Sequence, residues 1–180
     1  MDINDGWESQ ARAMVGQEFG PVYGPDRVNR AMVRHWCEAL GFPCDLAVST
    51  SSGSESGESL PVPSSMMQVW TMMGNRGEAA LPGGATDDAW KVLRLFADGG
   101  YSSIVGTSSD QHYARTIREG ERIAYMSHVS AISSLKKTGL GSGYFITVRY
   151  TFLSEGRDLV GTMDFCMLAH RKEQFEQVAQ

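Results

Sequence analysis

The stretch "GYFITVRYTFL", residues 143–153, alternates between apolar or aromatic side chains and polar ones over residues 146–152. Because successive side chains of a β-strand point to opposite faces, this alternation predicts a long strand with one buried face and one solvated face. The polar face carries Thr147, Arg149 and Thr151. The expected buried face is apolar and aromatic, and consists of Tyr144, Ile146, Val148, Tyr150 and Phe152.

Three neighbouring segments show the same two-residue period. Residues 101–115 ("YSSIVGTSSDQHYAR"), 121–132 ("ERIAYMSHVSAI") and 159–170 ("LVGTMDFCMLAH") each read as a strand, and "SEGRD" at 154–158 is a turn signal. Within residues 121–132, Ile123, Tyr125 and Val129 are expected on one side. The second half of the chain is therefore predicted to form an antiparallel sheet of about four strands.

The first half of the chain has a helical period. In "DRVNRAMVRHWCEAL", residues 26–40, either Asp26 or Asn29 can cap the start, and Gly41 stands at the end. Two shorter helical segments are predicted in 63–74 and in 87–100, the second capped by Thr86 or Asp87. We expect an α+β domain whose antiparallel sheet wraps around the long helix at 26–40. The apolar stripe predicted for that helix consists of Val28, Met32, Trp36, Ala39 and Leu40.

Composition narrows the class of protein. The 180 residues are expected to form a single domain, 1–180, with an N-terminal extension and a flexible Ser/Gly-rich loop at 41–62. A net charge of −5 argues against nucleic-acid binding, and no apolar run is long enough to span a membrane. Cys37, Cys44 and Cys166 lack metal-ligand spacing, so reduced thiols, a cytoplasmic location and no metal site are expected.

Four motifs together resemble the MaoC-like hydratases and dehydratases, which have the hot-dog fold. "GGYSSIVGTSSDQHYARTIREGERI" (99–123) resembles their glycine-tyrosine strand and the hairpin after it, and "LKKTGLGSGYFITVRYTF" (135–152) resembles a turn and strand. "PSSMMQVWTMMG" (63–74) and "VNRAMVRHWCEALG" (28–41) complete the match. The resemblance is greatest to the hot-dog domain of the larger subunit of heteromeric enoyl-CoA hydratases that act on steroid side chains.

The resemblance implies an enzymatic activity, and it also implies that this chain lacks the catalytic residues for it. Such enzymes add water to a 2-enoyl-CoA thioester, without a further cofactor, through an Asp and a His in a Gly-Asp-x-Asn-Pro-x-His loop. Here Gly41 keeps its place, but Phe42 stands where the aspartate would be, and no histidine follows in the loop. A phenyl ring cannot accept a proton, so this subunit is expected to lack the catalytic pair. Asp45 is the one nearby carboxylate that a shift of register could bring into the aspartate's place.

The resemblance also suggests where a substrate would lie. The backbone amides of Ser65 and Met66 would contact the thioester oxygen, and Met67 and Met72 would help line an apolar tunnel for a bulky ring system. Lys136 and Lys137, beside a glycine-rich turn, are candidates for CoA phosphates, although a solvated hairpin tip explains them equally well. The expected substrate-binding residues are Phe42, Ser64, Ser65, Met66, Trp70, Met73 and Tyr101.

Asp110 and His112 form a second candidate acid-base pair. They lie two residues apart on a predicted strand, so both side chains are expected on one face, where a carboxylate could raise the basicity of an imidazole. The alternative is an exposed polar pair without a catalytic role.

Three functions follow as hypotheses. The first is a non-catalytic, substrate-binding subunit of a heteromeric enoyl-CoA hydratase, partnered by a second hot-dog chain with an intact Asp/His loop. The second is a self-sufficient homodimeric hydratase, dehydratase or thioesterase that uses Asp45, Asp110 or His112. The third is an acyl-thioester binding module without turnover. Relatives of the larger subunit usually continue into an OB-like domain with a zinc ribbon, and this sequence has no Cys-x-x-Cys pair for one.

Overall fold

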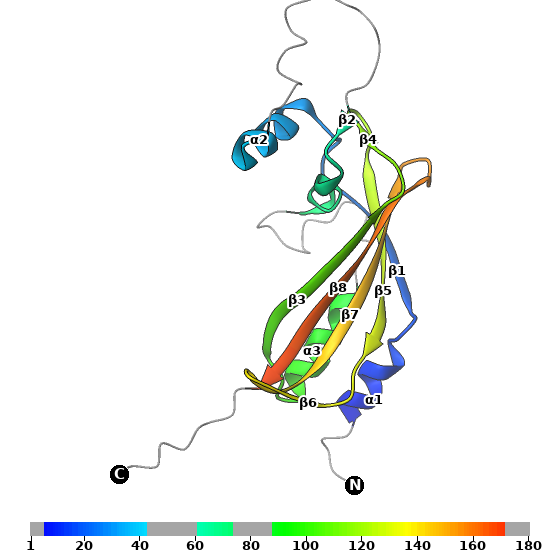
Figure 1. Ribbon diagram of the computed structural model, residues 1–180. Helices are drawn as coiled ribbons and strands as arrows, with labels where there is room; N and C mark the ends of the chain where they lie inside the picture. The colour runs from blue at the N-terminus through cyan, green and yellow to red at the C-terminus, as the bar shows by residue number, and fades with distance from the viewer. Residues whose placement is uncertain (1–5, 43–60, 74–87, 172–180) are drawn as a thin grey trace, which may run out of the picture.

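A six-stranded antiparallel sheet dominates the computed structural model, which describes residues 6–42, 61–73 and 88–171 (Figure 1). The small strands β2 (Pro61–Val62) and β4 (Ile117–Arg118) pair separately at one end. The main sheet has the order β1 (Glu18–Tyr23), β5 (Ile123–Ile132), β7 (Gly141–Ser154), β8 (Leu159–Arg171) and β3 (Ser103–Tyr113), with β6 (Lys136–Thr138) paired to the start of β7.

The alternation in residues 143–153 predicts the inner face of the sheet correctly. Each of the five expected inward side chains, from Tyr144 to Phe152, is at most 6% exposed. On β5, Ile123 and Val129 are buried, and Tyr125 packs against the same core. The strand β1 was not predicted, because "EFGPVY" is short and interrupted by Gly-Pro, and only its pairing with β5 makes it a strand.

The helix that packs on the sheet is α3 (Lys91–Asp98), which follows a 3₁₀ turn at Asp88–Trp90 and lies against the part of the sheet where β7 begins and β8 ends (Figure 1). Its Val92 and Phe96 are fully buried in one core cluster with Ile146 and Ala169 of the sheet. The α+β fold with an antiparallel sheet packed on a helix is thus confirmed. The prediction that residues 26–40 supply that helix was wrong.

Residues 30–40 do form a helix, α2 (Arg30–Leu40), which lies beyond one end of the sheet (Figure 1). The Asn29 side chain accepts a hydrogen bond from the Met32 amide at 3.0 Å, and Gly41 ends the helix with a φ of 68°. The buried side chains are Val33 and Cys37, whereas Leu40 is 51% exposed. The predicted stripe is therefore correct only in part: Val28 is buried and Trp36 packs against the core, whereas Met32, Ala39 and Leu40 are exposed. The sequence offers two adjacent apolar faces on this helix, and packing selects one.

Residues 63–74 were expected to be helical, but the described part is more irregular. Two 3₁₀ turns, Ser64–Met66 and Val69–Thr71, replace the helix. Met66, Met67 and Trp70 are nonetheless buried in the larger core cluster. The chain passes so close to Trp70 that a Cβ on Gly24 would lie 1.9 Å from the Trp70 carbonyl oxygen, so only glycine fits at that position.

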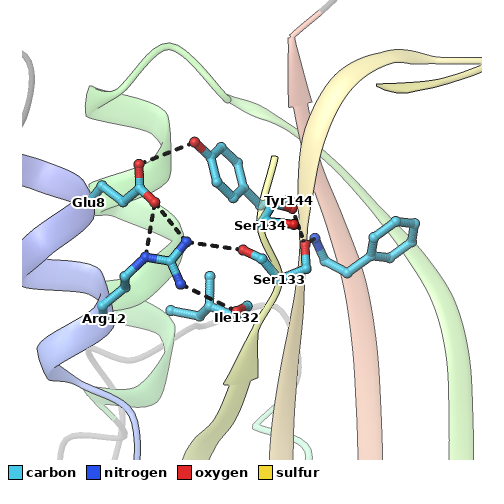
Figure 2. Close-up of polar contacts among 7 residues, drawn as sticks. Glu8, Arg12, Ile132, Ser133, Ser134 and Tyr144 are labelled. Carbon is cyan, nitrogen blue, oxygen red and sulfur yellow. Dashed lines mark hydrogen bonds and ion pairs between the residues drawn. The ribbon is translucent and has the colours of Figure 1, made fainter. Parts of the chain in front are cut away.

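The N-terminal helix α1 (Gly6–Ala13) packs beside α3 and is tied to the sheet by polar contacts (Figure 2). Trp7 meets the ring of Phe96 edge-on at a centroid distance of 5.1 Å. Glu8 accepts hydrogen bonds from the Tyr144 hydroxyl at 3.2 Å and from Arg12 at 2.6 Å. Arg12 also donates to the backbone oxygen of Ser133 at 3.1 Å. The N-terminal segment is therefore an integral part of the domain.

The contact between Glu8 and Tyr144 predicts how the free energy of unfolding changes at alkaline pH. Burial, followed by the charge of Glu8, raises the pKa of Tyr144 from 10.0 to about 12. Between these values an unfolded chain loses the phenolic proton before the folded chain does, so the stability from this site is intact below about pH 10 and is lost as the pH rises toward 12. We expect Tyr144→Phe to cost about 1 kcal/mol at neutral pH and to remove that alkaline loss.

Urea unfolding at a series of pH values measures this effect. Tyr113→Phe is the matched control, since the Tyr113 hydroxyl donates to the side chain of Gln111 at an exposed position. That change should alter the free energy of unfolding by less than about 0.5 kcal/mol. Equal alkaline losses in wild type and Tyr144→Phe would contradict the assigned pKa.

Candidate binding site

An apolar hollow of about 350 Å³ lies between the 3₁₀ turns and the inner face of the sheet. Four separate segments line it, because the turn after Trp70, the start of α3 and the strands β5 and β7 converge there. The lining side chains are Gln68, Thr71, Met72, Met73, Trp90, Tyr125, Tyr150 and Phe152.

Aromatic rings form the sheet side of this hollow. Tyr125 and Tyr150 meet edge-to-face with ring centroids 5.4 Å apart, and Tyr150 stacks on Phe152 at 6.2 Å. On the other side the Thr71 hydroxyl is held by the Gln68 carbonyl oxygen at 2.8 Å. Rigid rings opposite flexible methionines make a surface that suits a bulky apolar group.

The hollow has no acid-base pair among the residues that line it in the described part of the chain. Its lining includes neither a carboxylate nor an imidazole, and its polar groups are an amide and hydroxyls. A neutral amide is not a general acid or base at neutral pH, and a hydroxyl becomes an effective one only when a neighbouring group activates it. The described lining thus offers an apolar surface with hydroxyls and one amide, and it contributes no carboxylate or imidazole.

Asp110 and His112 lie on the outer face of the edge strand β3, away from this hollow. Both side chains share one face, as the sequence predicts, and both are exposed. Asp110 sits opposite Asp164 across the strand pair, and Asp164 forms a two-point ion pair with Arg149. The hydrogen bonds from Arg149 lower the pKa of the Asp164 carboxyl below its ordinary value. The structure therefore places Asp110 on a charged outer surface.

The residues predicted near the catalytic loop and near the thioester oxygen lie in separate parts of the structure. Phe42 follows α2 and is 57% exposed, and Asp45 lies outside the described residues. Ser64 and Ser65 are in the first 3₁₀ turn, where Ser64 is half-buried and Ser65 is exposed. The Met66 amide, expected to contact a thioester oxygen, donates instead to the Pro63 carbonyl oxygen at 2.9 Å. That amide is thus engaged within its own turn.

Of the other predicted substrate contacts, Met73 and Met72 do line the hollow. Trp70 is 2% exposed within the core, and its indole N–H is unpaired among the described residues. Tyr101 belongs to the second core cluster, where the Arg171 guanidinium lies 5.0 Å from its ring centroid. Lys136 and Lys137 are exposed on β6.

Sequence reasoning missed the aromatic wall of the hollow. Tyr125, Tyr150 and Phe152 were assigned to the buried face of the sheet, without a role in binding. Their inward alternation was a usable signal, since a tyrosine on a buried face brings a polar hydroxyl into an apolar region. Trp90 gave no comparable signal, because only the docking of α3 brings it beside the sheet.

The described residues offer neither a metal site nor a membrane-spanning helix. No group of three or more His, Cys, Asp or Glu side chains there could hold a metal ion. No helix in the same part of the chain is long and apolar enough to cross a membrane.

Comparisons with known proteins show the family of this chain and its fold. Residues 13–162 match the family described as "FAS1-like, dehydratase domain region". The chain is 36% identical over 178 residues to the probable enoyl-CoA hydratase alpha subunit of Thermomonospora curvata, covering 97% of this chain and 55% of that protein. It is 30% identical over 145 residues to the 3-oxo-4,17-pregnadiene-20-carboxyl-CoA hydratase alpha subunit of Mycobacterium tuberculosis, covering 80% of this chain and 45% of that protein. The chain thus spans about half the length of these relatives.

A solved structure shares the fold over nearly the whole chain. A chain of the ChsH1-ChsH2 complex from Mycobacterium tuberculosis superposes with a TM-score of 0.75 and 27% identity. The match covers 94% of this chain and 96% of that one. The expected resemblance to hot-dog hydratases is therefore confirmed at the level of fold and family.

Proposed function

Because the chain belongs to the FAS1-like dehydratase family of MaoC-like hot-dog domains, we propose that it is the substrate-binding, non-catalytic subunit of a heteromeric enoyl-CoA hydratase. It would hold a bulky 2-enoyl-CoA thioester, of which a steroid side-chain thioester is one candidate, in the cytoplasm. A partner hot-dog subunit would supply the acid and base that activate water.

One observation carries this proposal. The apolar hollow is lined by four aromatic rings and two methionines, and no carboxylate or imidazole lies among its described lining residues. Hydration needs a group that takes a proton from water and one that returns it to the substrate, and such groups must lie within hydrogen-bond reach of the reacting atoms. A hollow that binds without such a pair supports a subunit whose catalytic groups come from elsewhere.

The edge strand β3 is where the partner would bind. Among the described strands it pairs only with β8, and it is exposed along nearly its whole length. An unpaired edge of this length offers backbone hydrogen-bonding groups to a strand from another chain. Ile104 and Val105 add apolar surface there, at 40% and 38% exposure. The fold match to a chain of a two-protein complex supports a second hot-dog chain as the occupant.

Replacing apolar side chains of this edge by charged ones tests the interface. We expect Ile104→Lys combined with Val105→Lys to weaken association with the partner about tenfold, since lysines on an edge strand oppose pairing. Sedimentation equilibrium of the two subunits measures the change. The control is Leu140→Lys, because Leu140 is 54% exposed in the turn between β6 and β7 and lies outside the edge. Unchanged assembly in the double variant would place the partner elsewhere.

Alanine substitution of the three candidate catalytic residues tests the non-catalytic role itself. The variants Asp45→Ala, Asp110→Ala and His112→Ala are assayed in the assembled complex with a 2-enoyl-CoA substrate. We expect turnover within about twofold of wild type for each, because catalytic loss at a true acid or base is of the order of 100-fold or more. A loss of that size in any one of them would make this chain a catalytic subunit.

A further inference from the structure

The outer face of the main sheet carries a row of ionisable side chains that runs across five strands. Residues that pair directly across two strands point to the same face, so the register of the sheet places these side chains next to one another. The row ends on β3, which Figure 1 shows at the edge of the sheet opposite to β1. From β1 to β3 it consists of Glu18, His128, Arg149, Asp164 and Asp110.

The carboxylate at the end of this row is the uncompensated one. Arg149 donates two hydrogen bonds to Asp164, from Nε to Oδ1 at 2.7 Å and from Nη2 to Oδ2. This two-point contact occupies both oxygens of Asp164. Asp110 lies directly opposite Asp164 on the same face, and it has no ion pair among the described residues. Like charges that face each other across a strand pair repel, so Asp110 needs a cation on its other side.

The position on the other side of Asp110 lies outside this chain. Since β3 pairs only with β8 among the described strands, a strand added to its free edge would place one side chain about 5 Å from Asp110 on the same face. A cation at that position would compensate Asp110 and leave the pair of Arg149 and Asp164 intact. Asp110 is the one carboxylate of β3, so a single ionic contact would also fix the register of the added strand.

A second copy of this chain is poorly suited to supply that cation. The eleven residues of β3, "SIVGTSSDQHY", include no lysine and no arginine, and β1 at the opposite edge has none either. In any register of one β3 on another, the residue opposite Asp110 is neutral, acidic or His112, and histidine is mostly uncharged at neutral pH. The charge at this edge therefore disfavours self-association and favours a different chain.

We propose that β3 recognises a partner strand that carries a lysine or arginine opposite Asp110, and that this contact favours a different chain over a second copy of this one. The inference rests on the proposed function, since it takes the occupant of the β3 edge to be the partner hot-dog subunit. Backbone and apolar contacts of β3 then supply affinity, and Asp110 supplies discrimination between partners.

Sedimentation equilibrium of the two subunits, at about 50 mM and about 500 mM salt, tests this contact. We expect Asp110→Asn to weaken the complex about fivefold at the lower salt concentration and much less at the higher one, because salt screens an ion pair at the rim of an interface. Asp110→Lys should weaken it about thirtyfold at the lower salt concentration, since like charges would then meet. Asp110 is exposed, so neither change should disturb folding.

Glu18→Gln is the matched control, because Glu18 is an exposed carboxylate at the opposite end of the same row. This variant should associate as wild type does, and a loss confined to it would move the contact to β1. The chain without its partner gives a second readout, since we expect wild type not to dimerise through β3. A dimer of wild type that Ile104→Lys combined with Val105→Lys dissociates would overturn the proposed discrimination.

The outcomes separate this inference from the proposed function. If the two subunits hydrate a 2-enoyl-CoA together and both Asp110 variants associate as wild type does, the ionic contact is wrong and the function stands. If both variants weaken a complex that does not hydrate a 2-enoyl-CoA, the ionic contact stands and the function is wrong. Because the contact acts on assembly, turnover per assembled complex should stay unchanged when Asp110 is replaced.

Discussion

Replacing Phe96 by alanine is expected to lower the free energy of unfolding by about 3–5 kcal/mol, the range for a buried phenylalanine in a packed core. The Phe96 side chain is fully buried, and its ring meets those of Trp7 at 5.1 Å and Tyr144 at 5.2 Å. Truncation would leave a void between α1, α3 and the sheet. For a domain of ordinary stability this loss is a large fraction of the total.

Urea unfolding measures this cost, and a variant in α2 provides the control. Leu40→Ala removes a side chain that is 51% exposed, so it should cost less than about 1 kcal/mol. The comparison tests which helix the sheet packs against. A larger loss for Leu40→Ala than for Phe96→Ala would restore the helix at residues 26–40 to the centre of the domain.

The second large effect is expected at the rim of the apolar hollow. Met72 is 60% exposed and lines the hollow, so Met72→Asp should leave folding intact. When an acyl group covers this position, the new carboxylate loses water without gaining a partner, at a cost of about 2 kcal/mol. The affinity for an acyl thioester should therefore fall roughly thirty-fold.

Titration with acyl-pantetheine measures this change without involving phosphate contacts. Met32→Asp is the matched control, since Met32 is 39% exposed on α2 and does not line the hollow. Its affinity should equal that of wild type. If both variants bind acyl-pantetheine as wild type does, the acyl group lies elsewhere.

The sheet could be predicted from the sequence because its signal is local. Each inward residue from Tyr144 to Phe152 is two positions from the next, and this period does not depend on the rest of the chain. The buried face of α2 could not be predicted in the same way. Met32 and Leu40 lie beside Val33 and Cys37 on the helix surface, and only tertiary packing decides which pair is buried.

The candidate site was less predictable than the fold, for a related reason. Met72 and Met73 were expected near the substrate, since they share a segment with the family motif. Their partners Trp90, Tyr125 and Tyr150 come from segments far away in sequence. The pairing of β5 with β7 brings the two tyrosines together, and the docking of α3 brings Trp90 beside them. A resemblance to a family motif can be compared one position at a time, as at Phe42, which stands where the motif has an aspartate. The shape of a hollow depends on the whole fold.

The most direct test of the central claim is the rate of hydration of a 2-enoyl-CoA by the chain alone, by a partner hot-dog subunit alone, and by the two together. We expect background rates for this chain alone and enzymatic turnover for the complex, because the described lining of its apolar hollow provides no carboxylate or imidazole. Turnover by the chain alone at the rate of the complex would contradict the proposed non-catalytic role. It would then assign catalysis to residues of this subunit.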